Sequence, residues 1–368
     1  MTSGPRSVVL AGGGTAGHVS PLLALADCLR RRDPEVRIRV LGTAQGLESR
    51  LVPARGYELS VLPKVPLPRR PSMDLARLPL ALRAAVTAAG AAIDEVRADV
   101  VVGFGGYVST PAYLAARRRR IPVVVHEQNA RPGIANRLGA RFAEAVAVTF
   151  PSTPLPHATV VGMPLRREIS TLDRAARRAE ALELFGLGDR WPTVLVTGGS
   201  LGAARINDAF YGSVAALRDA GVQVLHVSGT GKDREVGQVP QGPPYVVLPY
   251  ADRMDLAYAA ADLVVARAGA STVCELTAVG LPAVYVPLPI GNGEQRLNAA
   301  GVVAAGGGIL VDDADLTSDW VGTSLVALAR DPERLAAMAA AALSVGERGA
   351  DELLADLVYA AARARLGG

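Results

Sequence analysis

Short apolar runs recur along the whole chain, and most are followed directly by glycine or by polar residues. The runs are rich in valine, isoleucine and leucine without alternation, which is typical of strands buried on both faces of a parallel sheet. Stretches with helical spacing of apolar residues separate them. The predicted strands are residues 7–10, 36–41, 59–62, 99–102, 121–125, 145–148, 159–161, 193–196, 223–227, 245–248, 263–266, 283–286 and 308–311. Strands that alternate with helices in this way predict an α/β fold.

The β–α alternation runs through the chain twice. With 368 residues the chain also exceeds the roughly 250–300 residues at which a single core stops growing. We therefore expect two Rossmann-like domains facing a cleft, residues 1–161 and 162–346, with Gly162, Met163 and Pro164 at the joint. A final helix over residues 350–366 is expected to pack back on the first domain.

Charge divides unevenly between the two halves. Residues 1–160 hold 21 Lys and Arg against 11 Asp and Glu, whereas the rest of the chain holds 18 against 24. This asymmetry indicates that the first half meets an anionic surface or ligand. Nucleic acid is disfavoured as that partner, because the basic half has few aromatic residues to stack on bases and no nucleic-acid-binding motif.

The two cysteines, Cys28 and Cys274, have no partner at the spacing of a metal or redox site. We expect both to be small buried apolar residues in a reducing compartment. No signal peptide is evident, and a long uncharged window, residues 276–293, contains too many prolines and glycines for a transmembrane helix.

Two motifs suggest a metal, but each has a better explanation or lacks a ligand. Asp313 and Asp315 form a D-x-D string, but they precede a helical pattern, so helix capping explains them better. His126 and Glu127 begin an H-E-x-x-H pattern whose second histidine is replaced by Ala130. We expect no catalytic metal and no cofactor.

A glycine-rich loop follows the first strand. Its G-x-G-x-x-G spacing, from Gly12 to Gly17, matches the dinucleotide fingerprint, but the second strand does not end in the acid that would hold a ribose. The nearest acid, Glu48, already lies in the next predicted helix. The loop is interpreted as a phosphate or close-approach loop. His18, directly after it, is either a structural cap or a general base.

A second loop of this kind follows the strand at 263–266. Arg267 and two small residues lead into the amino end of a helix, whose N–H groups and dipole suit a phosphate. The alternative is that Thr272 and Glu275 only form a capping box. Arg267 and Gln295 at the carboxyl ends of neighbouring strands favour a ligand site, since ligands of open α/β sheets bind there.

Polar residues also follow strands in the first half. Tyr107 lies in a glycine-rich segment after one strand, and His126, Glu127 and Asn129 follow the next. Side chains of this kind at the carboxyl ends of parallel strands are hard to explain as core, so they are candidate site residues.

A proline-rich basic segment, residues 63–71, precedes a helical pattern that begins at Met73. One interpretation is a surface loop with an ordinary packed helix. The other is a membrane-surface patch, in which apolar side chains enter the interface and arginines meet lipid phosphates. The candidate residues of this patch are Arg69, Arg70, Leu75, Leu78 and Arg117.

Six motifs in one order resemble the MurG family of peptidoglycan N-acetylglucosaminyltransferases. They are GGTAGH at 13–18, GGYVS at 105–109, HEQN at 126–129, GMPLR at 162–166, GGSLGA at 198–203 and RAGASTVCE at 267–275. The resemblance covers nearly the whole chain. It implies a GT-B fold and inverting transfer of GlcNAc from UDP-GlcNAc to the muramyl 4-hydroxyl of lipid I, which gives lipid II.

The resemblance also implies roles for individual residues. His18 is the expected base and Glu127 its alternative, while Glu275 is expected to hold the uridine ribose. The other expected donor-binding residues are Thr15, Ala16, Gly17, Asn129, Arg166, Ser200, Ala251, Arg267, Ala270, Ser271, Thr272, Val273, Cys274 and Gln295, and the acceptor side is expected to include Gly13, Gly14, Tyr107 and His126. Departures from the family pattern are Ala16, Leu201 and Glu294, of which only Glu294 adds a charge near the sugar.

The implied setting is the cytoplasmic face of the plasma membrane, with an anionic membrane surface and a possible cell-wall synthesis complex as partners. Three alternatives stay open at this point. They are a UDP-sugar epimerase, a non-catalytic UDP-sugar-binding protein and a nicotinamide-dependent oxidoreductase, the last disfavoured by the missing acid after the second strand.

Overall fold

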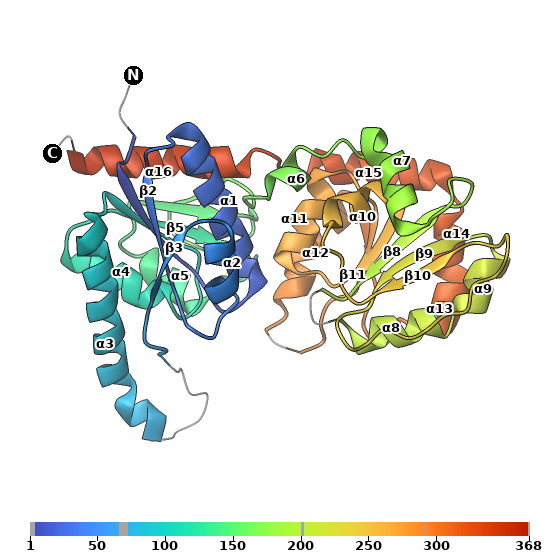
Figure 1. Cartoon of the computed structure of the whole chain (residues 1–368), viewed down its shortest axis with the longest axis horizontal. Coiled ribbons are helices and arrows are strands. Elements are labelled where there is room, and N and C mark those ends of the chain that lie inside the picture. Colours follow the sequence, from blue (N-terminus) through green and yellow to red (C-terminus); the bar gives the residue numbers. More distant parts are fainter. Residues whose placement is uncertain (1–3, 66–72, 200–201, 291, 367–368) are drawn as a thin grey trace. The chain divides into compact units, whose positions relative to one another are not determined.

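The computed structural model describes residues 4–65, 73–199, 202–290 and 292–366. It divides the chain into two compact units, and Figure 1 labels many of their helices and strands. The first unit contains Met1–Arg166 and Arg348–Gly368, and the second contains Arg167–Glu347. The first unit thus ends at Arg166 rather than at the expected 161, and the C-terminal helix belongs to it.

The first unit is built on a seven-stranded parallel sheet in the order β3-β2-β1-β4-β5-β6-β7. Its strands are β1 (Ser7–Ala11), β2 (Arg37–Gly42), β3 (Glu58–Val61), β4 (Val100–Gly103), β5 (Val123–Glu127), β6 (Ala145–Val148) and β7 (Ala158–Val160). Its helices are α1 (Ala16–Arg32), α2 (Glu48–Ala54), α3 (Met73–Val96), α4 (Ser109–Arg118), α5 (Ile134–Gly139) and α16 (Ala350–Leu366).

Both faces of the central part of this sheet are covered, which explains the apolar character of β1 and β4. Val8 and Leu10 of β1 point to a core shared with α1 and α16, where Leu25 and Leu354 lie. The intervening Val9 points to the opposite core, which α3 and α4 cover. Successive side chains of one strand therefore enter two different cores.

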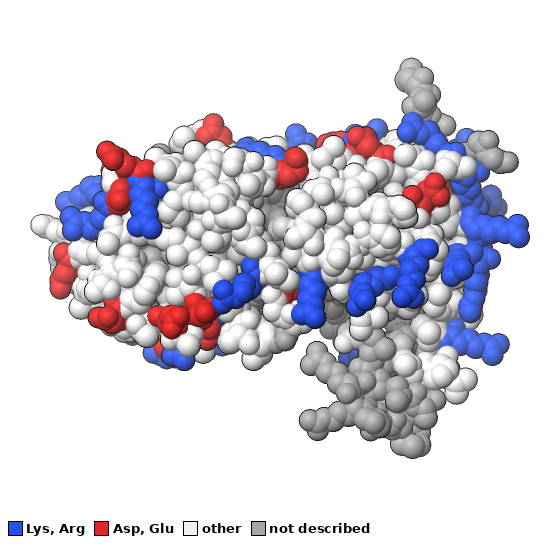
Figure 2. Space-filling model, turned by 180° about the vertical axis from the view of Figure 1, so that it is seen from behind, with Lys and Arg blue, Asp and Glu red and all other residues white. Residues whose placement is uncertain are grey.

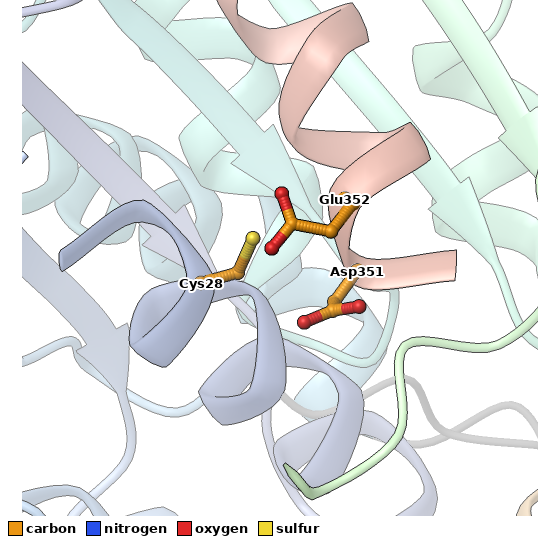
Figure 3. Close-up of side chains that lie close together, drawn as sticks. All are labelled: Cys28, Asp351 and Glu352. Atoms are coloured by element: carbon orange, nitrogen blue, oxygen red, sulfur yellow. The ribbon is translucent and has the colours of Figure 1, made fainter. Parts of the chain in front are cut away.

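Helix α16 is held to α1 by ion pairs. Arg31 contacts Asp351 at 2.7 Å, and Arg32 contacts Glu352 at 2.6 Å. Figure 3 shows Cys28 of α1 beside the same two carboxylates, with ligand atoms within 4.8 Å of one another. The guanidinium groups already neutralise both carboxylates, and burial raises the pKa of the Cys28 thiol to about 12. The cluster therefore serves helix packing rather than cation binding.

The second unit has a six-stranded parallel sheet in the order β10-β9-β8-β11-β12-β13. Its strands are β8 (Thr193–Thr197), β9 (Gln223–Val227), β10 (Tyr245–Leu248), β11 (Leu263–Ala266), β12 (Ala283–Tyr285) and β13 (Gly308–Leu310). Its helices are α6 (Arg167–Ser170), α7 (Arg174–Phe185), α8 (Ala204–Tyr211), α9 (Val214–Asp219), α10 (Met254–Ala260), α11 (Ala270–Ala278), α12 (Glu294–Ala304), α13 (Ser318–Trp320), the π-helix η1 (Val321–Leu325), α14 (Val326–Ala329) and α15 (Pro332–Ser344).

The predicted strands are confirmed, and two differences in bounds matter for the site. Strand β5 runs from Val123 to Glu127 instead of ending at 125, so His126 and Glu127 lie in the strand and are buried. Helix α1 begins at Ala16, ahead of Pro21, which places His18 in its first turn. Within the described ranges, no helix is both long and apolar enough to cross a membrane.

Candidate active site

Strand order identifies where a ligand site is expected in each unit. In the first unit β1 lies between β2 and β4, and in the second β8 lies between β9 and β11. The chain reverses its direction of winding at these points, and ligands of doubly wound sheets bind beside the carboxyl ends of the strands there. The loops after β1 and β4, and those after β8 and β11, are therefore the candidate site segments.

The two glycine-rich loops of the first unit are in close contact. A Cβ on Gly106 would lie only 2.6 Å from the carbonyl oxygen of Gly13, and Gly106 has a φ of +76°. Ser109 fixes this approach, because its hydroxyl donates to the carbonyl oxygens of Ala11 and Gly105 at 3.0 and 2.7 Å. Only residues without a side chain fit here, and Tyr107 projects from the same loop with half of its surface exposed.

His18 lies at this contact. Its Nδ1 is 3.0 Å from the hydroxyl of Thr15, the N-cap residue of α1. A Cβ on Gly105 would lie 3.3 Å from its Nε2, so the ring borders the second loop as well. Burial lowers the pKa of His18, opposed by the Gly13 carbonyl and the charge of Glu48. The ring is thus neutral at physiological pH and able to accept a proton.

Glu127, the alternative base, is engaged on both carboxylate oxygens. Oε1 accepts from the Asn129 amide at 3.0 Å, and Oε2 accepts from the Gly133 amide at 3.0 Å and from Asn136 Nδ2 at 2.9 Å. Burial raises the pKa of Glu127, while these hydrogen bonds lower it. The carboxylate shapes the loop at 128–133, which is a positioning role and does not favour Glu127 as the base.

His126 is also a structural residue. Its Nε2 lies 2.9 Å from the carbonyl oxygen of Gly162, and its Nδ1 lies 3.0 Å from Nε2 of Gln128. Gln128 is the donor at Nδ1, so the ring proton sits on Nε2 and is donated to Gly162. Burial lowers the pKa of His126 to about 4. Through this hydrogen bond to Gly162, the buried neutral ring connects the segment after β7 with the end of β5.

Sequence reasoning missed Asn136, which links these groups. Its Nδ2 donates to Glu127, and its Oδ1 accepts from the hydroxyl of Tyr113 at 2.7 Å. A Cβ on Gly105 would lie 3.2 Å from the same Nδ2. A buried amide between a carboxylate and a glycine loop forms no local motif, so spacing along the chain gives no signal for it.

In the second unit the loop after β11 leads into α11, with Gly269 as the N-cap. Helix geometry leaves the N–H groups of Ala270, Ser271 and Thr272 without acceptors inside the helix. The hydroxyl oxygen of Ser271 is buried and has no hydrogen-bond partner in the structure. These donors and the positive end of the helix dipole suit an anionic group.

The capping-box interpretation of this helix is wrong. Gly269 is the cap, and Thr272 lies inside the first turn of α11. Glu275 is instead contacted by Tyr258 of α10, whose hydroxyl donates to Oε2 at 2.7 Å. Val273 is buried, and Cys274 beside Glu275 is partly buried with its pKa raised by burial. The carboxylate is thus oriented by a neighbouring helix, a contact that no sequence motif predicts.

The aspartates of the D-x-D string have other partners than predicted. Thr317 is the N-cap of α13, so helix capping by Asp313 or Asp315 is wrong. Asp313 Oδ1 contacts Arg267 at 2.5 Å, and the same guanidinium donates to the carbonyl oxygens of Val286 and Pro287. Arg267 thereby ties together the loops after β11, β12 and β13.

The remaining donor candidates also lie at carboxyl ends of strands. Gln295, in the first turn of α12, accepts from the Leu288 amide at 2.9 Å through Oε1, so its NH₂ group is the part that can donate to a ligand. Ala251 is buried just beyond β10, and Asn129 is partly buried beyond β5. Arg166 is the last residue of the first unit before α6.

Some predicted residues lie outside the described residues. These are Ser200, Leu201, Arg69 and Arg70, and the side chain of Leu75 is likewise not described. Of the proposed membrane patch, Leu78 is partly buried, and the exposed Arg117 lies over the ring of Phe142 at 4.8 Å. Figure 2 shows Lys and Arg side chains gathered over the first unit, in agreement with the charge asymmetry.

A hollow of about 460 Å³ lies elsewhere, at the opposite edge of the second sheet. It is lined by Pro192, Asp262 and Pro282, which immediately precede β8, β11 and β12. These are amino ends of strands, so the hollow is not a candidate active site.

Comparison with known proteins identifies the family. The glycosyltransferase family 28 N-terminal domain matches residues 8–148, and the glycosyltransferase family 28 C-terminal domain matches residues 193–354. A UDP-N-acetylglucosamine–N-acetylmuramyl-(pentapeptide) pyrophosphoryl-undecaprenol N-acetylglucosamine transferase of Nocardioides sp. is 62% identical over 95% of this chain and 97% of its own length. The enzyme of the same description from Streptomyces avermitilis is 57% identical over 97% and 99%. The crystal structure of Acinetobacter baumannii MurG matches 96% of this chain and 99% of its own, with a TM-score of 0.78 and 29% identity.

The chain belongs to the MurG family. Its two parallel-sheet units are the two Rossmann-like domains of the GT-B fold, which confirms the predicted fold class. The MurG match spans both units, so the loops after β1 and β4 and the helix α11 all fall within the region shared with relatives.

Proposed function

We propose that this protein is an inverting glycosyltransferase that moves GlcNAc from UDP-GlcNAc to the muramyl 4-hydroxyl of lipid I, giving lipid II. The observation that carries the proposal is the 62% identity to a transferase of this printed description over nearly the full length of both chains. The geometry supports it, because each unit offers a polar site at the carboxyl ends of its strands. Neither a UDP-sugar epimerase nor a mere binding protein needs the second of these sites.

The donor is proposed to bind the second unit. The diphosphate is placed at the amino end of α11, where Ala270, Ser271 and Thr272 present N–H groups and a buried hydroxyl. Glu275 is proposed to accept hydrogen bonds from the ribose hydroxyls, oriented by Tyr258. Arg166 and the backbone near Ala251 are proposed to frame the uracil, while Asn129 and the NH₂ group of Gln295 contact the GlcNAc. Ser200 is assigned to the diphosphate, and Arg267, Val273 and Cys274 to the donor-site framework.

The acceptor is proposed to bind the first unit, beside Gly13, Gly14, Tyr107 and His126. Thr15, Ala16 and Gly17, which lead to His18, are proposed to face the diphosphate of the donor. The muramyl 4-oxygen attacks C1 of GlcNAc, the bond from C1 to the β-phosphate oxygen breaks, and UDP leaves with the electron pair. The proton of the attacking hydroxyl passes to the imidazole of His18, whose Nδ1 lies 3.0 Å from the Thr15 hydroxyl. The negative charge that develops on UDP is stabilised by the N–H groups of α11.

We also propose that the protein acts at the cytoplasmic face of the plasma membrane as a peripheral protein. Arg69, Arg70, Leu75, Leu78 and Arg117 form the proposed membrane patch. Because arginines dominate it, binding to anionic lipid vesicles should weaken as salt is raised. Participation in a cell-wall synthesis complex is part of the same proposal.

The test measures UDP release from UDP-GlcNAc with and without a short-chain lipid I analogue. Wild type, Glu275→Ala and the control Glu183→Ala, an exposed carboxylate on α7 of the same unit, are compared. The proposal expects acceptor-dependent release, a β-linked disaccharide, a strong loss in Glu275→Ala and none in the control. Release without acceptor would favour an epimerase or hydrolase, and donor binding without turnover would leave only a binding protein.

A further inference from the structure

A buried carboxylate lies at the glycine-rich loop that precedes His18. Glu48 is the first residue of α2, in the segment that follows β2, and its side chain has no exposed surface. Burying a charged carboxylate is unfavourable unless polar groups compensate for the lost water. The groups that compensate Glu48 are amides and a hydroxyl from two loops.

Three hydrogen bonds hold this carboxylate. Oε2 accepts from the Gly14 amide at 3.0 Å, while Oε1 accepts from the amide and the hydroxyl of Thr43, both at 2.8 Å. The first contact joins α2 to the loop after β1, and the other two join it to the loop after β2. Although burial raises it, these hydrogen bonds hold the pKa of Glu48 below its ordinary value, so the group is ionised.

Three glycines make room for the carboxylate. A Cβ on Gly13 would lie 2.4 Å from Oε1, one on Gly42 would lie 2.4 Å from Cγ, and one on Gly46 would lie 2.1 Å from Oε2. Each distance is far shorter than van der Waals contact. The Glu48 side chain therefore accounts for glycine at these three positions, and close approach of a bound nucleotide is not needed to explain them.

This arrangement differs from that of a dinucleotide-binding loop. There, amides of the glycine-rich loop face the pyrophosphate of the ligand, and the acid after the second strand faces the ribose. Here the acid comes from the next helix and accepts a hydrogen bond from the loop itself. The loop is thus fixed before any ligand binds, and it leads through Thr15 directly to His18.

We propose that Glu48 is a positioning residue of the transfer reaction, which fixes the Gly13–Thr15 loop and so places the His18 ring against the attacking hydroxyl. The inference rests on the proposed function, in which His18 is the base. The charge of Glu48 has a second effect, since it favours the protonated imidazole that forms when His18 takes the proton. Within the described residues, Glu127 of β5 is a second carboxylate in this region, and it accepts hydrogen bonds from the Gly133 amide and from Asn136 Nδ2.

The test replaces Glu48 by glutamine and by aspartate in the full chain and records kcat and KM against pH. Glu48→Gln removes the charge and turns an NH₂ group toward a donor, so we expect kcat to fall about 10- to 100-fold. The KM and affinity for UDP-GlcNAc should stay within about twofold, because the α11 amides, Glu275 and Gln295, which are proposed to bind the donor, lie in the other unit. The acid limb of the kcat profile should move to lower pH in Glu48→Gln and move less in Glu48→Asp, which keeps the charge. Glu35→Gln, an exposed carboxylate of the same unit, is the matched control and should change nothing.

The variants also separate positioning from mere folding. A lower melting temperature with an unmoved acid limb and unchanged kcat would overturn the proposal. Thr43→Val removes one hydrogen bond to Oε1 and keeps the charge, so it tests the same contact if Glu48→Gln does not fold. We expect Thr43→Val to lower kcat several-fold at unchanged donor affinity, and wild-type kinetics in both Thr43→Val and Glu48→Asp would contradict the role. Absence of transfer by the wild type would instead count against the proposed function.

Discussion

The hydroxyl of Tyr258 donates a hydrogen bond of 2.7 Å to Oε2 of Glu275, from one helix of the second unit to another. Tyr258 is buried in α10, whereas Glu275 is partly exposed at the carboxyl edge of the sheet. A buried phenol that holds one carboxylate oxygen restricts the rotation of the whole carboxylate. Glu275 therefore meets a ligand in a fixed orientation, and less side-chain entropy is lost on binding.

Removing this hydroxyl should weaken donor binding. In Tyr258→Phe the ring still fills its buried space, but the hydrogen bond to the carboxylate is lost, which is worth about 1.5–3 kcal/mol for a charged acceptor. We expect KM for UDP-GlcNAc to rise about tenfold with a smaller change in kcat. Steady-state kinetics with varied donor measure this. Tyr250→Phe, at an exposed tyrosine of the same unit, serves as the control. Equal KM values for Tyr258→Phe and wild type would show that Glu275 needs no orientation.

His18 and Glu127 should respond differently to substitution. His18→Gln removes the proposed base, so kcat should fall by about 10²–10⁴ and the acid limb of the pH profile should disappear. Glu127→Gln places an NH₂ group against amide donors of its own loop, so it should lower stability by about 1–3 kcal/mol and keep the acid limb. Urea unfolding and pH-dependent kcat measure the two effects. An intact acid limb in His18→Gln, together with its loss in a stable Glu127→Gln, would make Glu127 the base.

The fold could be predicted because it depends on local pattern. Buried parallel strands are apolar on both faces, so every strand of the two sheets coincides with a predicted apolar run. The apolar pattern does not predict the end of a strand correctly where the strand ends in buried polar residues. His126 and Glu127 continue β5, but their burial is compensated by Gly162, Asn129, Gly133 and Asn136, which only the folded chain brings near.

The candidate site was only partly predictable for the same reason. Glycine-rich loops and helix starts are local features, and they located Gly13, His18 and Ser271 correctly at carboxyl ends of strands. Glu48 and Tyr258 act across helices, at sequence distances where spacing carries no information. Asp313 shows the opposite error, since a local string suggested a cap while the side chain pairs with Arg267.

Two buried histidines should make the protein sensitive to acid. Burial lowers the pKa of His126 in the first unit and of His226 in the second to about 4, from an ordinary value of 6.5. The unfolded chain binds protons below about pH 6.5, whereas the folded chain resists them until about pH 4, so stability falls as the pH drops through this window. The loss should be on the order of 3 kcal/mol for each histidine and absent above pH 7.

Urea unfolding at pH 7 and pH 5 measures this effect. His226→Gln removes one of the two groups, so its stability should depend less on pH than that of wild type, whatever its stability at pH 7. His157→Gln, at an exposed histidine, should keep the full pH dependence. If His226→Gln and His157→Gln show the same slope, protonation of His226 does not limit stability in acid.

The ion pair between Arg267 and Asp313 should stabilise the second unit far more than a neighbouring pair on its surface. Both side chains are about 85% buried, and Arg267 also donates to the carbonyl oxygens of Val286 and Pro287. Asp313→Ala leaves a buried guanidinium without its counter-charge, so we expect a loss of about 3 kcal/mol in the free energy of unfolding. The adjacent Asp312 pairs with the exposed Arg296, and Asp312→Ala should lower the free energy of unfolding by less than about 1 kcal/mol.

The same ion pair argues against a metal at the D-x-D string. Because the Asp313 carboxylate already pairs with Arg267, added Mn²⁺ should not raise the stability of wild type relative to Asp313→Ala. A metal-dependent gain that vanishes in the variant would show that the D-x-D string binds a cation after all.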